Sequence, residues 1–329
     1  MKAIVCTRYG SPNTLQLREV AKPTPRDGEV LIRIHAASIN ARDWRLLRAQ
    51  PFFVRLMPGG LLRPRNAILG ADFAGRVEET GSHVTRFRPG DDVFGCLPSS
   101  ARRGTLAEYV CADEHLIVPK PANVPFEQAA AAPLAAMTAL QGLRDSGGVR
   151  AGQKVLIHGA SGGVGTFAVQ IAKALGVEVT AVCSTRNVDM VRSLGADLVV
   201  DYTKEDFTTG KQHYDVILAV NGYHPIADYL RALRSGGTCV VIGGSMLQLI
   251  QAASARQRTS GTGDRRVVVC SMARRQQDLV QIGEYLASGK IRAVVDAVYP
   301  LSRTAEAFWY FEREHARGKV VISMADGDA

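Results

Sequence analysis

Residues 155–165 read VLIHGASGGVG, an apolar run that passes directly into a glycine-rich turn. The next residues, 164–175, place apolar side chains at helical spacing along one stripe. Glycines permit a tight turn between a strand and a helix, and the backbone N–H groups of such a turn can bind a pyrophosphate at the positive end of the helix. The sequence therefore predicts a strand, a phosphate-binding turn and a helix.

The glycine spacing is GxxGxxG rather than the strict GxGxxG, because Ala160 occupies the place of one glycine. Alone, this spacing would fit a plain structural turn equally well. Strand and helix patterns nevertheless continue in alternation to about residue 242, with apolar runs at 177–182, 198–201 and 214–220. A doubly wound, parallel α/β sheet that binds a nucleotide is expected. The residues expected around the pyrophosphate are Gly159, Ser161, Gly162, Gly163 and Val164.

The flanking parts of the chain have a different rhythm. From residue 1 to about 121, short β-like runs alternate with Gly, Pro and Asp turns. Beyond residue 275 the pattern predicts a helix, a strand, a second helix and a final strand at 320–324. We therefore expect a β domain at 1–121, a nucleotide-binding domain at 122–274, and a C-terminal segment at 275–329 that completes the first domain.

The loop after the second strand of the nucleotide-binding domain indicates which cofactor binds. An NAD enzyme usually presents a carboxylate here to the ribose 2′-hydroxyl. This chain has Ser184 and Arg186 at that place, with no acidic residue before Asp189. A hydroxyl and a guanidinium suit a 2′-phosphate, so the sequence predicts NADPH. The alternative is that Arg186 is an ordinary solvent-facing arginine.

Composition narrows the class of protein. The chain has 329 residues, which exceeds the usual size of a single hydrophobic core, and it is 46% hydrophobic and 22% charged, as globular proteins are. The formal net charge is +9, but no run of five or six like charges occurs. Dispersed basic residues favour anionic small ligands over a nucleic acid. The six cysteines form no CxxC pair or tight cluster, which argues against a disulfide framework and a zinc ribbon.

Targeting signals are not evident in the sequence. The first residues lack the long apolar region of a signal peptide, and the most apolar stretch, 129–137, is far shorter than the roughly 18 residues of a membrane span. We therefore expect a cytoplasmic protein that does not associate with membranes.

Five sequence blocks resemble the quinone oxidoreductase branch of the medium-chain dehydrogenase/reductase superfamily. They are the glycine turn with AVQIAK at 168–173, LGADFAG at 69–75, PGDDVFG at 89–95, AMTAL at 136–140 and ARGKVV at 316–321. The blocks keep the order of the family along almost the whole chain. The resemblance implies a GroES-like β domain joined to a Rossmann domain, a cofactor held between the two domains, and a homodimer.

The zinc alcohol dehydrogenases of this superfamily hold a catalytic metal through two cysteines and a histidine. The positions that correspond here resemble Asn40, Ala71 and approximately Leu134, and none of them offers a thiolate or an imidazole. The four closely spaced cysteines of the structural zinc lobe are missing as well. The resemblance therefore implies a zinc-independent enzyme.

Without a metal, the alkoxide of a simple alcohol would be difficult to stabilise. Hydride addition to a quinone or an α,β-unsaturated carbonyl places charge on a conjugated oxygen, which ordinary hydrogen-bond donors can stabilise. Such a conjugated acceptor is the expected substrate. The alternatives are an enoyl reductase of a lipid or polyketide pathway, and a non-catalytic NADPH-binding protein with a structural, sensing or nucleic-acid role.

The resemblance also implies roles for four further residues. Asn40 would lie near the nicotinamide, where it orients the carboxamide or donates to the substrate oxygen; alternatively it satisfies a turn. Thr138 would contact the nicotinamide; alternatively its hydroxyl bonds to the preceding helical turn. Tyr202 and Lys319 would lie near the adenosine phosphate; the alternatives are a core tyrosine and an exposed lysine.

The segment 45–65 is unusually apolar for a connection between β elements. It is interpreted as a mobile wall of the substrate pocket, or equally as a packed helix or a dimer contact.

Overall fold

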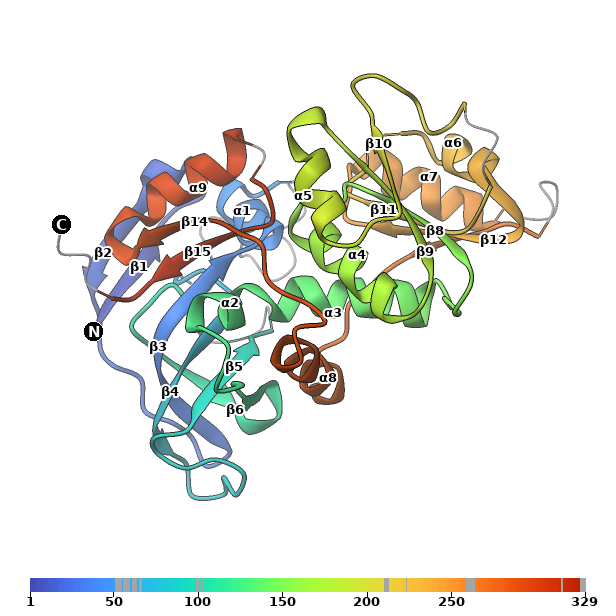
Figure 1. The fold of residues 1–329 in the computed structure, drawn as a ribbon. Helices are drawn as coiled ribbons and strands as arrows, with labels where there is room; N and C mark the ends of the chain where they lie inside the picture. The colour runs from blue at the N-terminus through green and yellow to red at the C-terminus, as the bar shows by residue number, and fades with distance from the viewer. Residues whose placement is uncertain are drawn as a thin grey trace. The chain divides into compact units, whose positions relative to one another are not determined.

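The computed structural model describes residues 1–50, 55, 60, 64, 67–98, 101, 103–209, 213–222, 224–257, 264–314 and 316–325, with the backbone alone for 253–257. The described chain forms two compact units (Figure 1). The first unit contains residues 1–134 and 274–329, and the second contains residues 135–273. Within the described residues, no helix combines the length and the apolar composition that a membrane span requires.

The second unit is built on a parallel sheet. Its described strands pair in the order β10-β9-β8-β11-β12-β13, and every pair is parallel. All residues of β11 are buried, as expected for a central strand covered on both faces. The strands are β8 (Lys154–His158), β9 (Glu178–Cys183), β10 (Leu198–Asp201), β11 (Tyr214–Val220), β12 (Leu233–Ile242) and β13 (Arg266–Val269).

The strand order reverses at β8, and this reversal determines where the helices lie. The chain proceeds from β8 through β9 to β10 on one side, and from β11 through β12 to β13 on the other. Because such crossovers are right-handed, α4 and α5 cover one face of the sheet while α6 and α7 cover the opposite face (Figure 1). The predicted doubly wound fold is confirmed. The helices are α3 (Pro133–Gln141), which starts in the first unit, α4 (Gly163–Ala174), α5 (Val188–Ser193), α6 (Ile226–Ala232) and α7 (Met246–Gln257).

The first unit is a β domain. Its larger described sheet has the order β14-β15-β3-β4-β5-β7, with β6 also paired to β3, and a separate hairpin joins β1 to β2. The long strand β3 organises the sheet because it pairs with three other strands. The strands are β1 (Lys2–Cys6), β2 (Leu15–Glu19), β3 (Glu29–Ile39), β4 (Asp72–Thr80), β5 (Asp92–Cys96), β6 (Tyr109–Asp113), β7 (Ile117–Pro119), β14 (Val295–Pro300) and β15 (Lys319–Ser323).

The C-terminal segment returns to this domain, as predicted. Strand β15 pairs antiparallel with β3, placing Val321 opposite Ser38, and β14 pairs parallel with β15. In Figure 1 the red C-terminal strands accordingly lie beside the blue β3. The helices of this unit are α1 (Ala41–Arg48), α2 (Phe126–Ala131), α8 (Gln276–Ala287) and α9 (Thr304–Arg313).

The first domain boundary differs from the expected one. The change of pattern after Pro121 suggested that the second domain begins at residue 122, but the first unit extends to Leu134. Helix α2 accounts for the difference: it packs on β3 and β4, and its small residues Ala129, Ala130 and Ala131 are buried. A helical pattern does not by itself reveal which sheet the helix covers. The second boundary, after residue 273, lies within one residue of the expected position.

Candidate functional site

The glycine-rich turn connects β8 to α4 in the second unit, as predicted. Gly159 has a φ of 78°, and a Cβ atom there would lie 2.3 Å from the carbonyl oxygen of Val220. At Gly165 a Cβ atom would lie 2.1 Å from the carbonyl oxygen of Gly159. Both glycines are therefore required for the turn itself, where the backbone packs too closely for any side chain.

Gly162 differs from these two glycines. A Cβ atom at this position would meet nothing closer than the oxygen of Gly159, 3.7 Å away, so the fold alone leaves room for a side chain. Gly162 is also the N-cap of α4, and no side chain caps this helix. The amino end of a twelve-residue helix carries partial positive charge and orients N–H groups outward. An open, uncapped helix start of this kind fits a phosphate group.

The remaining predicted residues of the turn are Ser161, Gly163 and Val164, and all three are half-buried. They occupy the end of the turn and the first positions of α4. In a doubly wound sheet, ligands bind outside the carboxyl ends of the strands where the strand order reverses. Because β8 lies at this reversal, the turn is placed where the topology predicts a ligand.

The residues predicted for the 2′-phosphate gather at the neighbouring strand end. Ser184 follows β9 and is half-buried, and its hydroxyl accepts a hydrogen bond from Asn187 Nδ2 at 3.1 Å. Arg186 is exposed in the short 3-10 helix Thr185–Asn187. Tyr202 is 44% exposed, and its backbone N donates to the oxygen of Cys183 at 3.1 Å. The structure thus brings Ser184, Arg186 and Tyr202 to one edge of the sheet.

A carboxylate at this edge was missed by the sequence analysis. Asp201, the last residue of β10, lies opposite Cys183 of β9 in the strand register. Asp201 belongs to the third strand of this sheet, whereas the cofactor was predicted from the loop that follows the second strand. The parallel pairing of the two strands could have revealed it, because parallel strands end at the same edge.

His158 closes β8 immediately before the turn and is buried. Its Nδ1 lies 2.7 Å from the hydroxyl oxygen of Tyr229, and its ring contacts those of Phe207 and His224. Burial, assisted by the nearby His224, lowers the pKa of His158 to about 4. The imidazole is therefore neutral at physiological pH and belongs to the core beneath the turn.

Thr138 lies in α3 and is 8% exposed. Its contact with a nicotinamide stays a prediction.

Asn40 lies in the first unit, at the junction of β3 and α1, within a buried polar cluster. Its Nδ2 donates to Asp72 Oδ2 at 3.0 Å and to the backbone oxygen of Ser38 at 3.4 Å. Its Oδ1 accepts a hydrogen bond from Lys319 Nζ at 2.5 Å. Both ends of the amide are thus engaged by the protein, so direct donation to a substrate would require one of these bonds to break. The catalytic assignment of Asn40 stays a prediction.

The orientation of Lys319 differs from the predicted one. We expected a lysine directed at the adenosine phosphate, or otherwise an exposed lysine, but Lys319 is only 3% exposed. Its ammonium donates to Asn40 and to the oxygen of Ile39, and it lies 3.6 Å from Asp72 Oδ2. The inward orientation follows from the pairing of β15 with β3, which the sequence motif could not show. Burial lowers the pKa of Lys319, and Asp72 and Asp43 act in the opposite direction.

The positions that correspond to zinc ligands surround this cluster. Ala71 is fully buried, and the backbone N of Leu134 donates to Asp72 Oδ1 at 3.0 Å. Asp43 accepts a hydrogen bond from the backbone N of Asn40 at 2.9 Å, so it caps the start of α1. Burial raises the pKa of Asp43. Among the described residues, no group of three or more His, Cys, Asp or Glu side chains is arranged to hold a metal ion.

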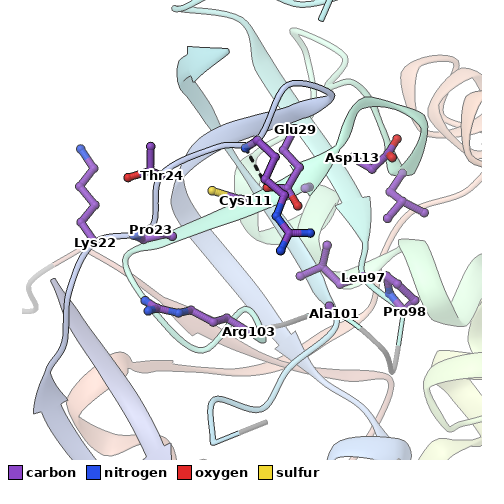
Figure 2. Close-up of a pocket in the computed structure, with 13 residues that line it drawn as sticks. Lys22, Pro23, Thr24, Glu29, Leu97, Pro98, Ala101, Arg103, Cys111 and Asp113 are labelled. Atoms are coloured by element: carbon purple, nitrogen blue, oxygen red, sulfur yellow. Dashed lines mark hydrogen bonds between the residues drawn. The ribbon is translucent and has the colours of Figure 1, made fainter. Parts of the chain in front are cut away.

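A separate cavity of about 750 Å³ lies in the first unit (Figure 2). Basic and acidic side chains line it together, and the backbone N of Arg26 donates to Glu29 Oε2 at 3.0 Å across one wall. None of the predicted site residues lines this cavity. The lining residues are Lys22, Pro23, Thr24, Arg26, Glu29, Leu97, Pro98, Ala101, Arg103, Cys111, Ala112, Asp113 and Leu116.

The apolar segment interpreted as a pocket wall falls largely outside the described residues. Only its beginning at Arg45–Gln50, together with Arg55, Gly60 and Pro64, is described. Arg45 to Arg48 belong to α1.

Fold and site together define a dinucleotide-binding α/β protein with an added β domain. Residues 26–122 match the alcohol dehydrogenase GroES-like domain family, and residues 194–322 match the zinc-binding dehydrogenase family. The chain is 35% identical over 332 residues to a 2-methylene-furan-3-one reductase of Solanum lycopersicum. It is equally similar to an NADPH-dependent alkenal/one oxidoreductase, chloroplastic, of Arabidopsis thaliana. Each match covers 98% of this chain and 79% of the relative.

The solved structures agree with the sequence relatives. The quinone oxidoreductase from Coxiella burnetii is similar with a TM-score of 0.86 and 31% identity, over 98% of this chain and 99% of the other. The chain therefore belongs to the medium-chain dehydrogenase/reductase family, in the branch of quinone oxidoreductases and alkenal/one reductases. The resemblance inferred from the sequence blocks is confirmed.

Proposed function

We propose that this chain is an NADPH-dependent, zinc-independent reductase that transfers hydride to a quinone or an α,β-unsaturated carbonyl. The open space over Gly162, at the uncapped start of α4, is the observation that carries the proposal, because it provides a phosphate site that the fold does not otherwise need. The names of the relatives support the same cofactor and the same substrate class.

Different residues of the second unit would bind different parts of the cofactor. The N–H groups at the start of α4 would hold the pyrophosphate, and Ser184 and Arg186 would hold the 2′-phosphate. Thr138 would contact the nicotinamide. NADPH, when bound, supplies the hydride, and the protein supplies position and electrostatics.

A catalytic zinc ion does not fit the residues of the first unit. Asn40, Ala71 and Leu134 provide no thiolate or imidazole, and the carboxylate of Asp72 already faces the ammonium of Lys319. A divalent cation beside Asp72 would meet this buried positive charge. We therefore derive no step through a metal, although the matched family for residues 194–322 is described as zinc-binding.

A panel of acceptors tests the proposal. NADPH oxidation should be observed with quinones, or with short alkenals and enones, as acceptors. A strong preference for enoyl thioesters would instead favour the enoyl reductase alternative. Cofactor binding without turnover of any acceptor would favour a non-catalytic NADPH-binding protein.

We further propose that the chain forms a homodimer and acts in the cytoplasm. The edge strand β13 and the neighbouring α7 expose Val269, Leu247 and Ile250, which are apolar side chains suited to a second copy. Light scattering at several protein concentrations would measure the oligomeric state. Imaging of a tagged chain in cells would test the location, because some relatives are named chloroplastic and others mitochondrial.

A further inference from the structure

The ends of β9 and β10 place a carboxylate beside the predicted 2′-phosphate residues. Asp201 and Cys183 are register partners, and both strands end at this edge of the sheet. In an NAD enzyme a carboxylate at this edge accepts a hydrogen bond from the ribose 2′-hydroxyl. The chain therefore has an acidic group near the place where an NAD enzyme needs one, although β10 supplies it rather than β9.

The oxygens of Asp201 are already engaged within the protein. Oδ2 accepts a hydrogen bond from Thr185 Oγ1 at 2.6 Å, and Oδ1 accepts from the backbone N and Oγ1 of Thr203 at 3.0 and 2.7 Å. Lys204 Nζ lies 3.5 Å from Oδ2. A carboxylate offers about four acceptor positions, so most of its capacity is taken up.

The two hydroxyls form a connected cage around the carboxylate. Thr185 Oγ1 and Thr203 Oγ1 lie 2.9 Å apart, and the side chain of Asp201 is only 10% exposed. The hydrogen bond from Thr185, followed by those from Thr203, lowers the pKa of Asp201 to about 2. The group is therefore negatively charged at neutral pH.

An ionised carboxylate at this edge would favour NADH over NADPH in two ways. With free acceptor positions it would bind the 2′-hydroxyl of NADH, and with an unscreened charge it would repel the 2′-phosphate of NADPH. The hydrogen-bond donors of Thr185 and Thr203 weaken both effects, because they occupy the acceptor positions of the carboxylate and partly offset its charge.

We propose that Thr185 is a specificity-determining residue whose hydroxyl holds the Asp201 carboxylate in a cage and so favours NADPH over NADH. The proposal rests on the proposed function, because it names a further determinant of the same cofactor site.

The primary experiment replaces the hydroxyl while keeping the shape of the side chain. Calorimetry of wild type and Thr185→Val with adenosine 2′,5′-bisphosphate and with 5′-AMP measures the preference for a 2′-phosphate without turnover. We expect this preference to fall about tenfold, which corresponds to about 1.4 kcal/mol of differential binding free energy. The kcat/KM values for NADPH and NADH should change in the same sense. Thr185→Ser keeps the hydroxyl and should keep the preference.

A double-mutant cycle separates an effect through Asp201 from a direct contact with the phosphate. In an Asp201→Asn background no charge remains to be caged, so Thr185→Val should no longer alter the preference. A full effect in that background would overturn the proposal, because the hydroxyl would then act on the phosphate itself. An unchanged preference in the single variant would overturn it too.

Two further measurements keep the result interpretable. Thr203→Val removes the second hydroxyl of the cage and should lower the preference in the same direction, which provides an independent test if Thr185→Val loses its fold in thermal melting. If the wild type binds neither adenosine fragment nor NADPH, the proposed function itself fails. If the wild type prefers the 2′-phosphate and the variants do not differ from it, only the role of Thr185 is wrong.

Discussion

The ammonium of Lys319 lies 2.5 Å from the side-chain oxygen of Asn40, although 279 positions separate the two residues in the chain. Lys319 begins β15, and Asn40 precedes α1 directly after β3. This hydrogen bond therefore joins the C-terminal segment to the first domain. The nearby Asp72 balances the lysine charge at a distance of 3.6 Å.

Removal of the lysine should destabilise the protein strongly. In Lys319→Met the Asp72 carboxylate stays buried without its cationic partner, and breaking a buried ion pair in this way typically costs about 3–5 kcal/mol. The denaturant midpoint of the variant should fall accordingly. The double variant Asp72→Asn, Lys319→Met leaves no unpaired charge, so it should be more stable than the single variant. If the double variant were the less stable, the ion pair would not be the cause.

The substitution Gly162→Ala should leave the fold intact but weaken cofactor binding. A Cβ atom there has 3.7 Å to its nearest neighbour, so the melting temperature of Gly162→Ala should stay close to that of the wild type. NADPH affinity, measured by calorimetry, should fall because the methyl group occupies space needed by the pyrophosphate. The control Gly165→Ala should destabilise the fold, because its Cβ would lie 2.1 Å from a backbone oxygen. Unchanged NADPH affinity in Gly162→Ala would contradict the phosphate site.

Arg186 should distinguish the two nicotinamide cofactors. A hydrogen bond to a charged group contributes roughly 1.5–3 kcal/mol, which corresponds to about tenfold to a hundredfold in affinity. Because Arg186 is exposed, the smaller effect is expected for Arg186→Ala with NADPH, and NADH should hardly be affected. The comparison is kcat/KM for both cofactors with one acceptor. Arg192→Ala, which changes an exposed arginine of α5, serves as the control. An equal loss of kcat/KM for both cofactors would indicate that Arg186 supports the fold and does not bind the 2′-phosphate.

His158 should make the stability of the protein depend on pH in mildly acidic solution. Its pKa is about 4 in the folded protein, whereas an ordinary solvated histidine has a pKa of 6.5, so the unfolded chain binds the proton first as the pH falls. Stability should therefore be lost between about pH 6.5 and pH 4, by up to about 3 kcal/mol. His158→Gln retains a partner for Tyr229 but does not titrate, so its stability should vary less over this range. Equal pH dependence in urea unfolding of both proteins would refute this account.

Zinc should be dispensable for the reductase activity. The purified protein should oxidise NADPH at the same rate before and after treatment with a chelator, because Asn40, Ala71 and Leu134 offer no ligands suited to zinc. Elemental analysis provides a second measurement. Stoichiometric zinc, with activity lost to the chelator and restored by the metal, would show that other residues form a metal site.

Local sequence patterns determined the architecture of the second unit. The strands Leu198–Asp201 and Tyr214–Val220 agree with the expected ranges, because continuous apolar runs bounded by turns are a strong signal for buried parallel strands. The glycine turn and the loop containing Ser184 and Arg186 were found in the same way. Each of these features lies within a few consecutive residues, and local sequence patterns can specify it.

Only the tertiary structure decided which distant residues meet. The inward orientation of Lys319 depends on the pairing of β15 with β3, and the position of Asp201 beside Thr185 depends on the pairing of β10 with β9. The assignment of α2 to the first unit likewise depends on its packing against β3 and β4. A single sequence specifies the periodicity of each element but leaves the partners of its faces and edges open. Burial and charge balance were therefore decided by the assembled sheet, where an ammonium, an amide and a carboxylate from distant segments share one buried space.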